Sequence, residues 1–368
     1  MNQSPTSPKI LVAPLDWGLG HATRCIPIIK ELIRDNCTVL IAASGNIKIL
    51  LQAEFPSLQF LDLPGYNIEY AASSWGLAAK IVAQIPKILS AIKEEQAWLK
   101  KVVEEEKIDA VISDNRYGLY HPQIRSVFIT HQLLIKAPVQ LAEEILQDIN
   151  YDYINKFDEC WVPDAEGENN LAGSLSHPGS MPKIQVRYIG PVSRFGSSNV
   201  AEEKHLLLLL SGPEPQRSLL EENLLEDIKE YAKPVVLVRG LTQAEDELEA
   251  DDNVIVFNHL PASQLEEKTQ EASFVIARCG YSTVMDLAAL KKKSVLIPTP
   301  GQTEQEYLAD HLMQRNFALC IPQKKFRLKQ ALEFAQRFNY SLSVPKDNNL
   351  TAVVRAFIEG LRAGNLKS

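Results

Sequence analysis

The hydrophobic residues of this chain fall into short runs of strand length, and most of these runs precede a segment with helical spacing. The predicted strands of the first half are Ile10–Leu15, Thr38–Ala43, Leu58–Leu63, Asp109–Ser113, Val127–Thr130 and Glu159–Pro163. The predicted helices between them are Ala22–Asp35, Ile47–Ala53 and Leu77–Glu106, the last with a break at Pro86 as an alternative. This alternation predicts a parallel sheet with helices on both faces.

The same alternation starts again after a polar segment. Arg194–Lys204 has the composition of a linker, and buried runs follow it at Leu206–Leu210, Val235–Val238, Val254–Phe257, Phe274–Ala277 and Ser294–Pro298. Helices are expected after the segment Ser211–Pro213, close to Ser282 or Thr283, and from Glu304. The predicted divisions are an N-terminal domain over 1–193, a linker over 194–204, a C-terminal domain over 205–348 and a C-terminal segment over 349–368.

Two such halves give an α/β fold with two parallel sheets and a cleft between them. In sheets of this kind, ligands bind beyond the carboxyl ends of the strands. Almost every unusual polar residue of this chain follows a predicted strand. The helix Asn349–Leu361 is expected to pack back towards the N-terminal domain.

Composition narrows the function without identifying it. The chain has 368 residues, enough for two domains, and a formal net charge of −8, which argues against a nucleic-acid-binding protein. Its five cysteines are scattered and form no C-x-x-C pair, so reduced thiols in the cytoplasm are expected. The polar start lacks the apolar core of a signal peptide, and no run is long enough to span a bilayer.

One apolar stretch leaves an alternative open. The predicted helix 77–106 either packs on the sheet or exposes part of its apolar stripe, with Lys80, Lys87 and Lys93 touching a membrane surface. The second reading places the protein peripherally at the inner face of the membrane.

The most specific motif is the segment from Ile276 to Asp286, in which a buried strand leads through Arg278 and Gly280 into a helix containing Ser282 and Thr283. Exposed amides at a helix N-terminus attract phosphate, and they can hold a diphosphate without a metal. Asp286 could accept hydrogen bonds from ribose hydroxyls. The competing interpretation is a capping box formed by Thr283 and Asp286.

Two further motifs follow strands. Gln302, Gln305 and Glu306 crowd a strand end and a helix start, and such side chains suit sugar hydroxyls, although a solvated, well-capped helix start has the same composition. Gly18 and Gly20 would let the backbone approach a ligand, and His21 would serve as a general base or, alternatively, cap the helix.

In combination these motifs resemble glycosyltransferase family 28, which includes the N-acetylglucosaminyltransferase that makes lipid II. The resemblance is carried by the segments 278–286 and Pro298–Glu306, by the loop Gly18–His21, and by Thr130–Gln132. It implies the GT-B fold, two Rossmann-like domains facing a central cleft, with acceptor bound by the first and nucleotide by the second. The C-terminal motifs are specific, and the N-terminal ones are looser.

The resemblance also implies roles for individual residues. Ser282 and Thr283 would contact the diphosphate, Asp286 the ribose, Gln305 and Glu306 the donor sugar, and Asn258 and His259 the base. The family usually has Glu where Asp286 stands and often Gln where Glu306 stands. The loop of Ser211 and Gly212 departs from the family's glycine-rich form because it carries Pro213 and Pro215.

The expected reaction is inverting, metal-independent transfer from a UDP-sugar to an unidentified acceptor, lipid-linked, glycan or small-molecule. His21 would act as the base, with His131 and Asp114 in reserve, and helix amides would stabilise the leaving charge. The chain has no Asp-x-Asp motif of the kind that holds a metal in other glycosyltransferases. The alternatives are a nucleotide-sugar 2-epimerase and a non-catalytic subunit that binds a sugar nucleotide.

Overall fold

The computed structural model describes residues 7–66, 74–137, 140–196, 203–243, 248–343 and 349–364, and the expected linker 194–204 therefore lies partly outside the described residues. The chain divides into two compact units. The first comprises Met1–Ile68, Ala83–Val192 and Pro345–Ser368, and the second comprises Glu69–Val82 and Ser193–Val344. Each unit has its own sheet and its own hydrophobic core.

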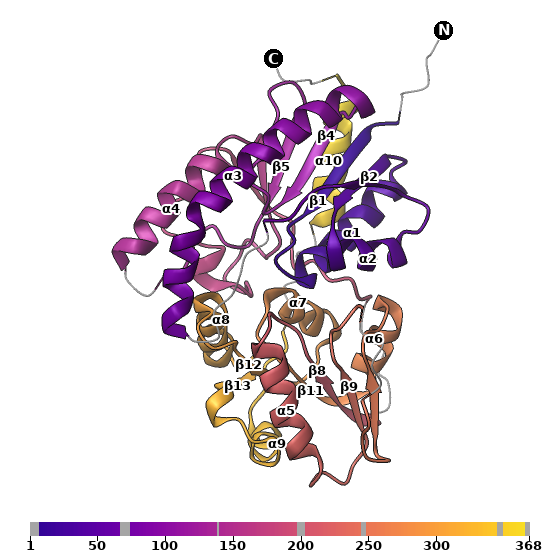
Figure 1. Cartoon of the computed structure of the whole chain (residues 1–368), viewed down its shortest axis with the longest axis vertical. Coiled ribbons are helices and arrows are strands. Elements are labelled where there is room, and N and C mark those ends of the chain that lie inside the picture. The colour runs from indigo at the N-terminus through magenta and orange to yellow at the C-terminus, as the bar shows by residue number, and fades with distance from the viewer. Residues whose placement is uncertain are drawn as a thin grey trace. The chain divides into compact units, whose positions relative to one another are not determined.

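The first unit is built on a seven-stranded parallel sheet with the order β3-β2-β1-β4-β5-β6-β7 (Figure 1). Its strands are β1 (Lys9–Pro14), β2 (Thr38–Ala43), β3 (Gln59–Asp62), β4 (Ala110–Asp114), β5 (Arg125–Ile129), β6 (Glu159–Val162) and β7 (Gln185–Tyr188). Its helices are α1 (Leu19–Arg34), α2 (Gly45–Glu54), α3 (Ser74–Glu106, in this unit from Ala83 on), α4 (Gln140–Ile154), η1 (Gly173–Leu175) and α10 (Leu350–Arg362). The inner strands are buried at nearly every position and mostly apolar, as expected of strands covered on both faces.

The second unit repeats this plan with a six-stranded parallel sheet in the order β10-β9-β8-β11-β12-β13. Its strands are β8 (His205–Leu209), β9 (Val235–Val238), β10 (Val254–Phe257), β11 (Ala272–Arg278), β12 (Ser294–Ile297) and β13 (Leu319–Cys320). Its helices are α5 (Gln216–Ile228), α6 (Ala262–Gln270), α7 (Tyr281–Leu290), α8 (Thr303–Gln314), η2 (Gln323–Lys325) and α9 (Leu328–Arg337).

In both sheets the strand order reverses beside the first strand of the unit, between β1 and β4 and between β8 and β11. At the carboxyl ends of these pairs, Pro14 lies opposite Asp114 and Ala277 lies opposite Leu209, although the register of β8 and β11 shifts between Ala272 and Phe274. Such a reversal opens a crevice at the carboxyl edge, where doubly wound proteins bind ligands. Gly18 and His21 follow β1 at the first of these switch points, and Asp114 is the last residue of β4.

The C-terminal helix α10 belongs to the first unit, and its yellow ribbon lies among the indigo and magenta elements of that unit in Figure 1. It packs on α1: Thr351 donates to Glu31, and Arg362 donates to the backbone oxygen of Asp35 across 2.6 Å. The Phe357 ring meets Trp161 edge-on, with 5.4 Å between ring centroids. The last helical segment of the chain therefore completes the core of the first unit.

Several predicted boundaries were wrong by a few residues. Helix α1 starts at Leu19, so Gly20 and His21 lie inside its first turn and not in a turn before it. Helix α7 starts at Tyr281 and α8 at Thr303, and α3 runs through Pro86 without a break. The strands β7 and β13 and the helices α4, α6 (Ala262–Gln270) and α9 were missed, because each carries a short or half-polar pattern.

Candidate active site

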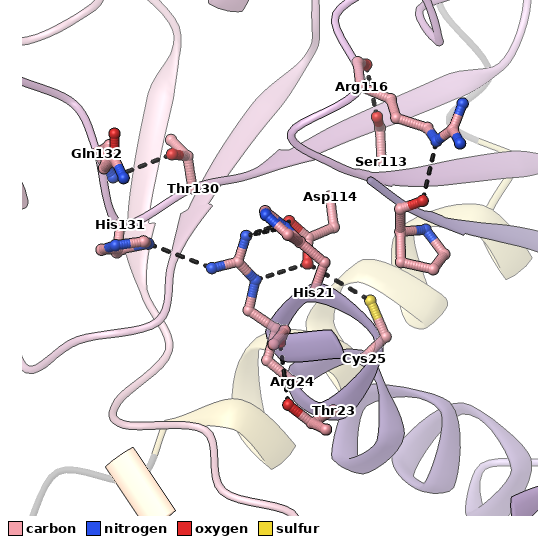
Figure 2. Close-up of polar contacts among 12 residues, drawn as sticks. His21, Thr23, Arg24, Cys25, Ser113, Asp114, Arg116, Thr130, His131 and Gln132 are labelled. Carbon is pink, nitrogen blue, oxygen red and sulfur yellow. Dashed lines mark hydrogen bonds and ion pairs between the residues drawn. The ribbon is translucent and has the colours of Figure 1, made fainter. Parts of the chain in front are cut away.

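The carboxyl edge of the first sheet gathers a cluster of charged and titratable side chains. His21 and Arg24 come from the start of α1, Asp114 is the last residue of β4, and His131 lies two residues beyond β5. Figure 2 shows the Arg24 guanidinium between Asp114 and His131, with His21 directed at the same carboxylate. These residues are 90 or more positions apart across α1 and β4, and the neighbouring strands β1, β4 and β5 bring them together.

The imidazole of His21 is paired with a buried carboxylate. Its Nδ1 lies 3.0 Å from Oδ1 of Asp114, whose side chain is 0% exposed, whereas 18% of the His21 side chain remains exposed. Arg24 donates from Nε to the second oxygen of Asp114 across 2.5 Å and from Nη2 to the first. The carboxylate is therefore enclosed by its partners, and the half-buried ring of His21 is the part of the group that a ligand can reach.

The pKa values of this pair follow from its charges. Burial lowers the pKa of His21, Arg24 lowers it further, and the attraction of Asp114 opposes both only in part. Burial alone would raise the pKa of Asp114, but Arg24 and His21 together hold it well below its usual range. At neutral pH the pair is therefore a neutral imidazole beside an ionised carboxylate, the charge state that a general base requires.

A buried ion pair supports the loops that carry this cluster. Arg116, just beyond β4, donates from Nη1 to Glu95 of α3 across 2.8 Å and from Nε to the backbone oxygen of Pro14 across 2.9 Å. Tyr66 donates to the same Glu95 carboxylate across 2.7 Å. This network joins the end of β1, which leads into Gly18, to the segment that follows Asp114.

The predicted nucleotide motif lies at the switch point of the second sheet. Gly280 is the N-cap of α7, and Tyr281, Ser282 and Thr283 form the first turn, with Ser282 and Thr283 half-buried. The first amides of a helix have no partner within it, and glycine has no side chain to cap them. A side chain built onto Gly280 would meet nothing within 4 Å. The capping box of Thr283 and Asp286 was wrong, since Thr283 lies inside the helix.

Other predicted donor-site residues hold the protein's own loops together. Asp286 is buried and accepts hydrogen bonds from Ser193 Oγ across 2.7 Å and from Arg194 Nε across 3.1 Å. The buried Arg278 guanidinium donates to the backbone oxygen of Gln216 and to Gln323. Burial lowers the pKa of Arg278 to about 10. Both side chains thus organise the switch point from the inside.

The segment after β12 is organised by its own amide and carboxylate groups. Gln305 accepts a hydrogen bond from the backbone N–H of Thr299 across 2.9 Å and donates to Gln302 across 2.5 Å. Glu306 accepts from the backbone N–H of Gly301, whose φ of +83° favours glycine. The structure therefore brings these predicted sugar-binding side chains into one turn.

The remaining predicted residues lie at the carboxyl ends of strands in the second unit. Asn258 and His259 follow β10, and Asn258 accepts a hydrogen bond from Arg239 across 2.9 Å. Ser211 and Gly212 follow β8, and Gly212 has a φ of +103°. A Cβ atom placed on Gly212 would lie 3.8 Å from Thr299 Oγ1. Within the described ranges, no three His, Cys, Asp or Glu residues are grouped so that they could hold a metal ion.

Comparisons with known proteins agree with this architecture. Residues 219–358 match the glycosyltransferase family 28 C-terminal domain. An uncharacterized glycosyltransferase of Methanosarcina acetivorans is 22% identical over 317 residues, 81% of each chain. The UDP-N-acetylglucosamine–N-acetylmuramyl-(pentapeptide) pyrophosphoryl-undecaprenol N-acetylglucosamine transferase of Bacillus subtilis is 22% identical over 349 residues, 86% of this chain and 87% of that protein.

Among solved structures, the glycotransferase of kitacinnamycin is similar with a TM-score of 0.63 at 17% identity, over 98% of this chain and 96% of that one. The predicted GT-B fold of two Rossmann-like domains is confirmed. The protein is a glycosyltransferase of the GT-B type, and it resembles family 28. In the part of the chain that the structure describes, no helix is both long and apolar enough to cross a membrane.

Proposed function

We propose that this glycosyltransferase moves a hexose or N-acetylhexosamine from a UDP-sugar to an acceptor hydroxyl, with inversion at the anomeric carbon and without a metal ion. The observation that carries the proposal is the contact of 3.0 Å between His21 Nδ1 and Asp114 Oδ1. A neutral imidazole whose Nδ1 is held by a carboxylate keeps its Nε2 lone pair for a proton.

In the proposed step, His21 Nε2 takes the proton of the acceptor hydroxyl. The acceptor oxygen forms a bond to the anomeric carbon as the bond from that carbon to the diphosphate breaks, so UDP leaves with the electron pair. Asp114 stabilises the imidazolium that forms. Within the described residues, the hydrogen bond of His21 to Asp114 is made through Nδ1 and none is made through Nε2, which agrees with this assignment.

The leaving diphosphate needs positive charge, and the start of α7 can supply it. The amides of Tyr281, Ser282 and Thr283 stand at the positive end of the helix dipole, next to Gly280. Such a site neutralises a diphosphate with no divalent cation, which supports a metal-independent reaction. The Bacillus subtilis relative is named for its use of UDP-N-acetylglucosamine, which supports UDP as the nucleotide.

The same relative acts on a pyrophosphoryl-undecaprenol acceptor, which supports a lipid-linked acceptor and peripheral contact with the inner face of a membrane. Helix α3 exposes Lys87, Lys93 and Leu89, of which Leu89 is 40% exposed and Lys93 stands one helical turn after it. The side chain of Lys80 lies outside the described residues. Glycan and small-molecule acceptors are the alternatives. We propose the cytoplasm as the location of the protein when it is not in contact with the membrane.

A donor screen followed by product analysis tests the proposal. Calorimetry with UDP, UDP-glucose and UDP-N-acetylglucosamine in the presence of a chelator should show binding without added metal. Mass spectrometry with candidate acceptors should then show a glycosylated product, whose anomeric configuration is opposite to that of the donor. A strict requirement for a divalent cation contradicts the proposal, an epimerised nucleotide sugar identifies a 2-epimerase, and binding without any turnover identifies a binding subunit.

A further inference from the structure

The buried guanidinium of Arg24 contacts three titratable side chains of the candidate active site, Asp114, His21 and His131. Its side chain is 3% exposed and lies one helical turn after His21. Nε donates to Asp114 Oδ2 across 2.5 Å, Nη2 donates to Asp114 Oδ1, and Nη1 lies 3.2 Å from Nδ1 of His131 (Figure 2). Nη2 also lies 2.7 Å from Nδ1 of His21. One guanidinium thus contacts a carboxylate and two imidazoles.

The chemistry of these groups fixes where the ring protons are. A guanidinium only donates hydrogen bonds, so Nδ1 of His131 must be the acceptor and the proton of that ring is on Nε2. Nδ1 of His21 faces both Arg24 and Asp114. Because Nη2 donates to the carboxylate, and because N–H to carboxylate is the stronger, charge-assisted bond, Nδ1 of His21 carries a proton and donates it to Asp114.

We propose that Arg24 is a positioning residue that holds the two histidines in opposite neutral tautomers, His21 protonated on Nδ1 and His131 protonated on Nε2. The inference rests on the proposed role of His21 as the base. Without a cation beside it, a histidine paired with a carboxylate would favour the imidazolium form, which cannot accept a proton. Arg24 prevents this by its charge, while Asp114 accepts the Nδ1 proton and so leaves the lone pair of His21 on Nε2.

The charges that surround His21 support this balance. Arg24 and His131 lower the pKa of His21 after burial has lowered it, and Asp114 raises it. The remaining titratable group of the cluster is Cys25, whose Sγ lies 3.7 Å from Asp114 Oδ2 and whose pKa burial raises well above its ordinary value. The thiol is therefore neutral, and Arg24 is the only cation among the described side chains that contact this carboxylate.

The test is ¹⁵N NMR of the histidine ring nitrogens in the full-length chain, where an unprotonated nitrogen resonates far downfield of a protonated one. The signals are assigned with His21→Gln and His131→Gln among the seven histidines. In the unaltered protein at neutral pH, Nε2 of His21 and Nδ1 of His131 should be the unprotonated nitrogens. The same protonated nitrogen in both rings would overturn the proposal.

Two variants separate positioning from packing. Arg24→Met removes the charge, so the pKa of His21 should rise by about 1 unit or more and the acid limb of kcat/KM should move to higher pH by the same amount. A uniform loss of rate at every pH, with an unmoved acid limb, is the result of a packing role and would contradict the proposal. If the Met variant does not fold, Arg24→Lys keeps the charge, and the pKa of His21 should stay close to its original value. His131 should then become a mixture of tautomers, because one ammonium group cannot replace the several N–H donors of the guanidinium. An unchanged His131 tautomer in the Lys variant would refute the role of Nη1.

This test is distinct from that of the proposed function, since the NMR measurement requires no turnover. Opposite tautomers together with full activity of His21→Gln would support the positioning by Arg24 and reject the general base. Loss of activity in His21→Gln together with identical tautomers would support the general base and reject the positioning by Arg24.

Discussion

Arg194 donates from Nε to Oδ2 of Asp286 across 3.1 Å, in an ion pair whose side chains are 11% and 9% exposed. The carboxylate predicted to contact a ribose therefore already has two donors, Arg194 and Ser193. A ribose hydroxyl could add to these bonds, because an ionised carboxylate accepts at about four lone-pair positions. Asp286 thus joins the start of α7 to the segment that follows Val192, whether or not it also binds a nucleotide.

We expect Asp286→Ala to lower the free energy of unfolding by about 1.5–3 kcal/mol, because Arg194 loses a charged partner. Donor binding should weaken by about 1–3 kcal/mol if the ribose contact exists. Calorimetry with UDP, below the melting temperature of the variant, separates the two effects. Asp286→Asn is the matched control, since its amide oxygen can still accept from Ser193. A destabilised Ala variant that binds UDP normally would limit Asp286 to a structural role.

We expect Gln305→Ala to spare the binding of UDP and to weaken that of the UDP-sugar, because the side chain is assigned to the sugar. The Ala variant also loses the bond to Thr299 that shapes the turn after β12. Gln305→Glu keeps an acceptor for Thr299 and removes only the donor group, so it isolates the contact with the sugar. Affinities for UDP and for UDP-sugar are compared by calorimetry, and equal losses for both ligands would contradict the assignment.

The pH dependence of kcat/KM should report the ionisation of His21. The neutral ring is the active form, and both burial and Arg24 lower its pKa in the folded protein. Activity should therefore be constant at neutral pH and fall on acidification through a midpoint below the ordinary histidine value of about 6.5. Initial rates between pH 4.5 and 8 measure this midpoint. A midpoint above the ordinary value would show that Asp114 outweighs Arg24.

We expect Asp114→Asn to reduce turnover by about 100-fold or more, because the Asn amide can donate to Nδ1 of His21 and so reverse the tautomer. Donor affinity should be unchanged, since Asp114 lies in the first unit and the nucleotide motif in the second. Cys25→Ala is the control, as it removes another contact of the same carboxylate without changing the ion pair. Equal kinetics of the Asn variant and the unaltered protein would remove Asp114 from the mechanism.

The free energy of unfolding at low pH should depend on the ionisation of Asp114. The pKa of Asp114 is depressed in the folded protein, so its contribution is fully present above its unfolded pKa of about 3.9 and is lost as the pH falls through the folded value. Urea unfolding of the unaltered protein below pH 4 should show this loss. The Asn variant should lack that part of the dependence.

The sequence predicted the strands of both sheets well because their residues are apolar on both faces, as in β1 and β8. It also placed Gly18, His21, Asp114 and His131 at strand ends. It missed Arg24, a charged residue near the start of an amphipathic helix, which in the sequence has the pattern of an ordinary surface residue. Only the pairing of β1 with β4 reveals that this side chain is buried on Asp114.

The same limit applies to Asp114, which the sequence offered as a reserve base. A position at a strand end gives no measure of enclosure, and the structure places the carboxylate at 0% exposure among Arg24, His21 and Cys25. Likewise, the partners of Asp286 and Arg278 come from segments distant in sequence. Local spacing identified these residues but could not assign their contacts.

The role of His21 as the base of glycosyl transfer can be measured in the variant His21→Ala, with donor affinity by calorimetry and turnover by product formation. If His21 is the base, turnover should fall by about 100-fold or more while the affinity for the UDP-sugar stays nearly unchanged. Persistent turnover would contradict this role of His21, and a collapse of donor affinity would make His21 a ligand of the diphosphate instead.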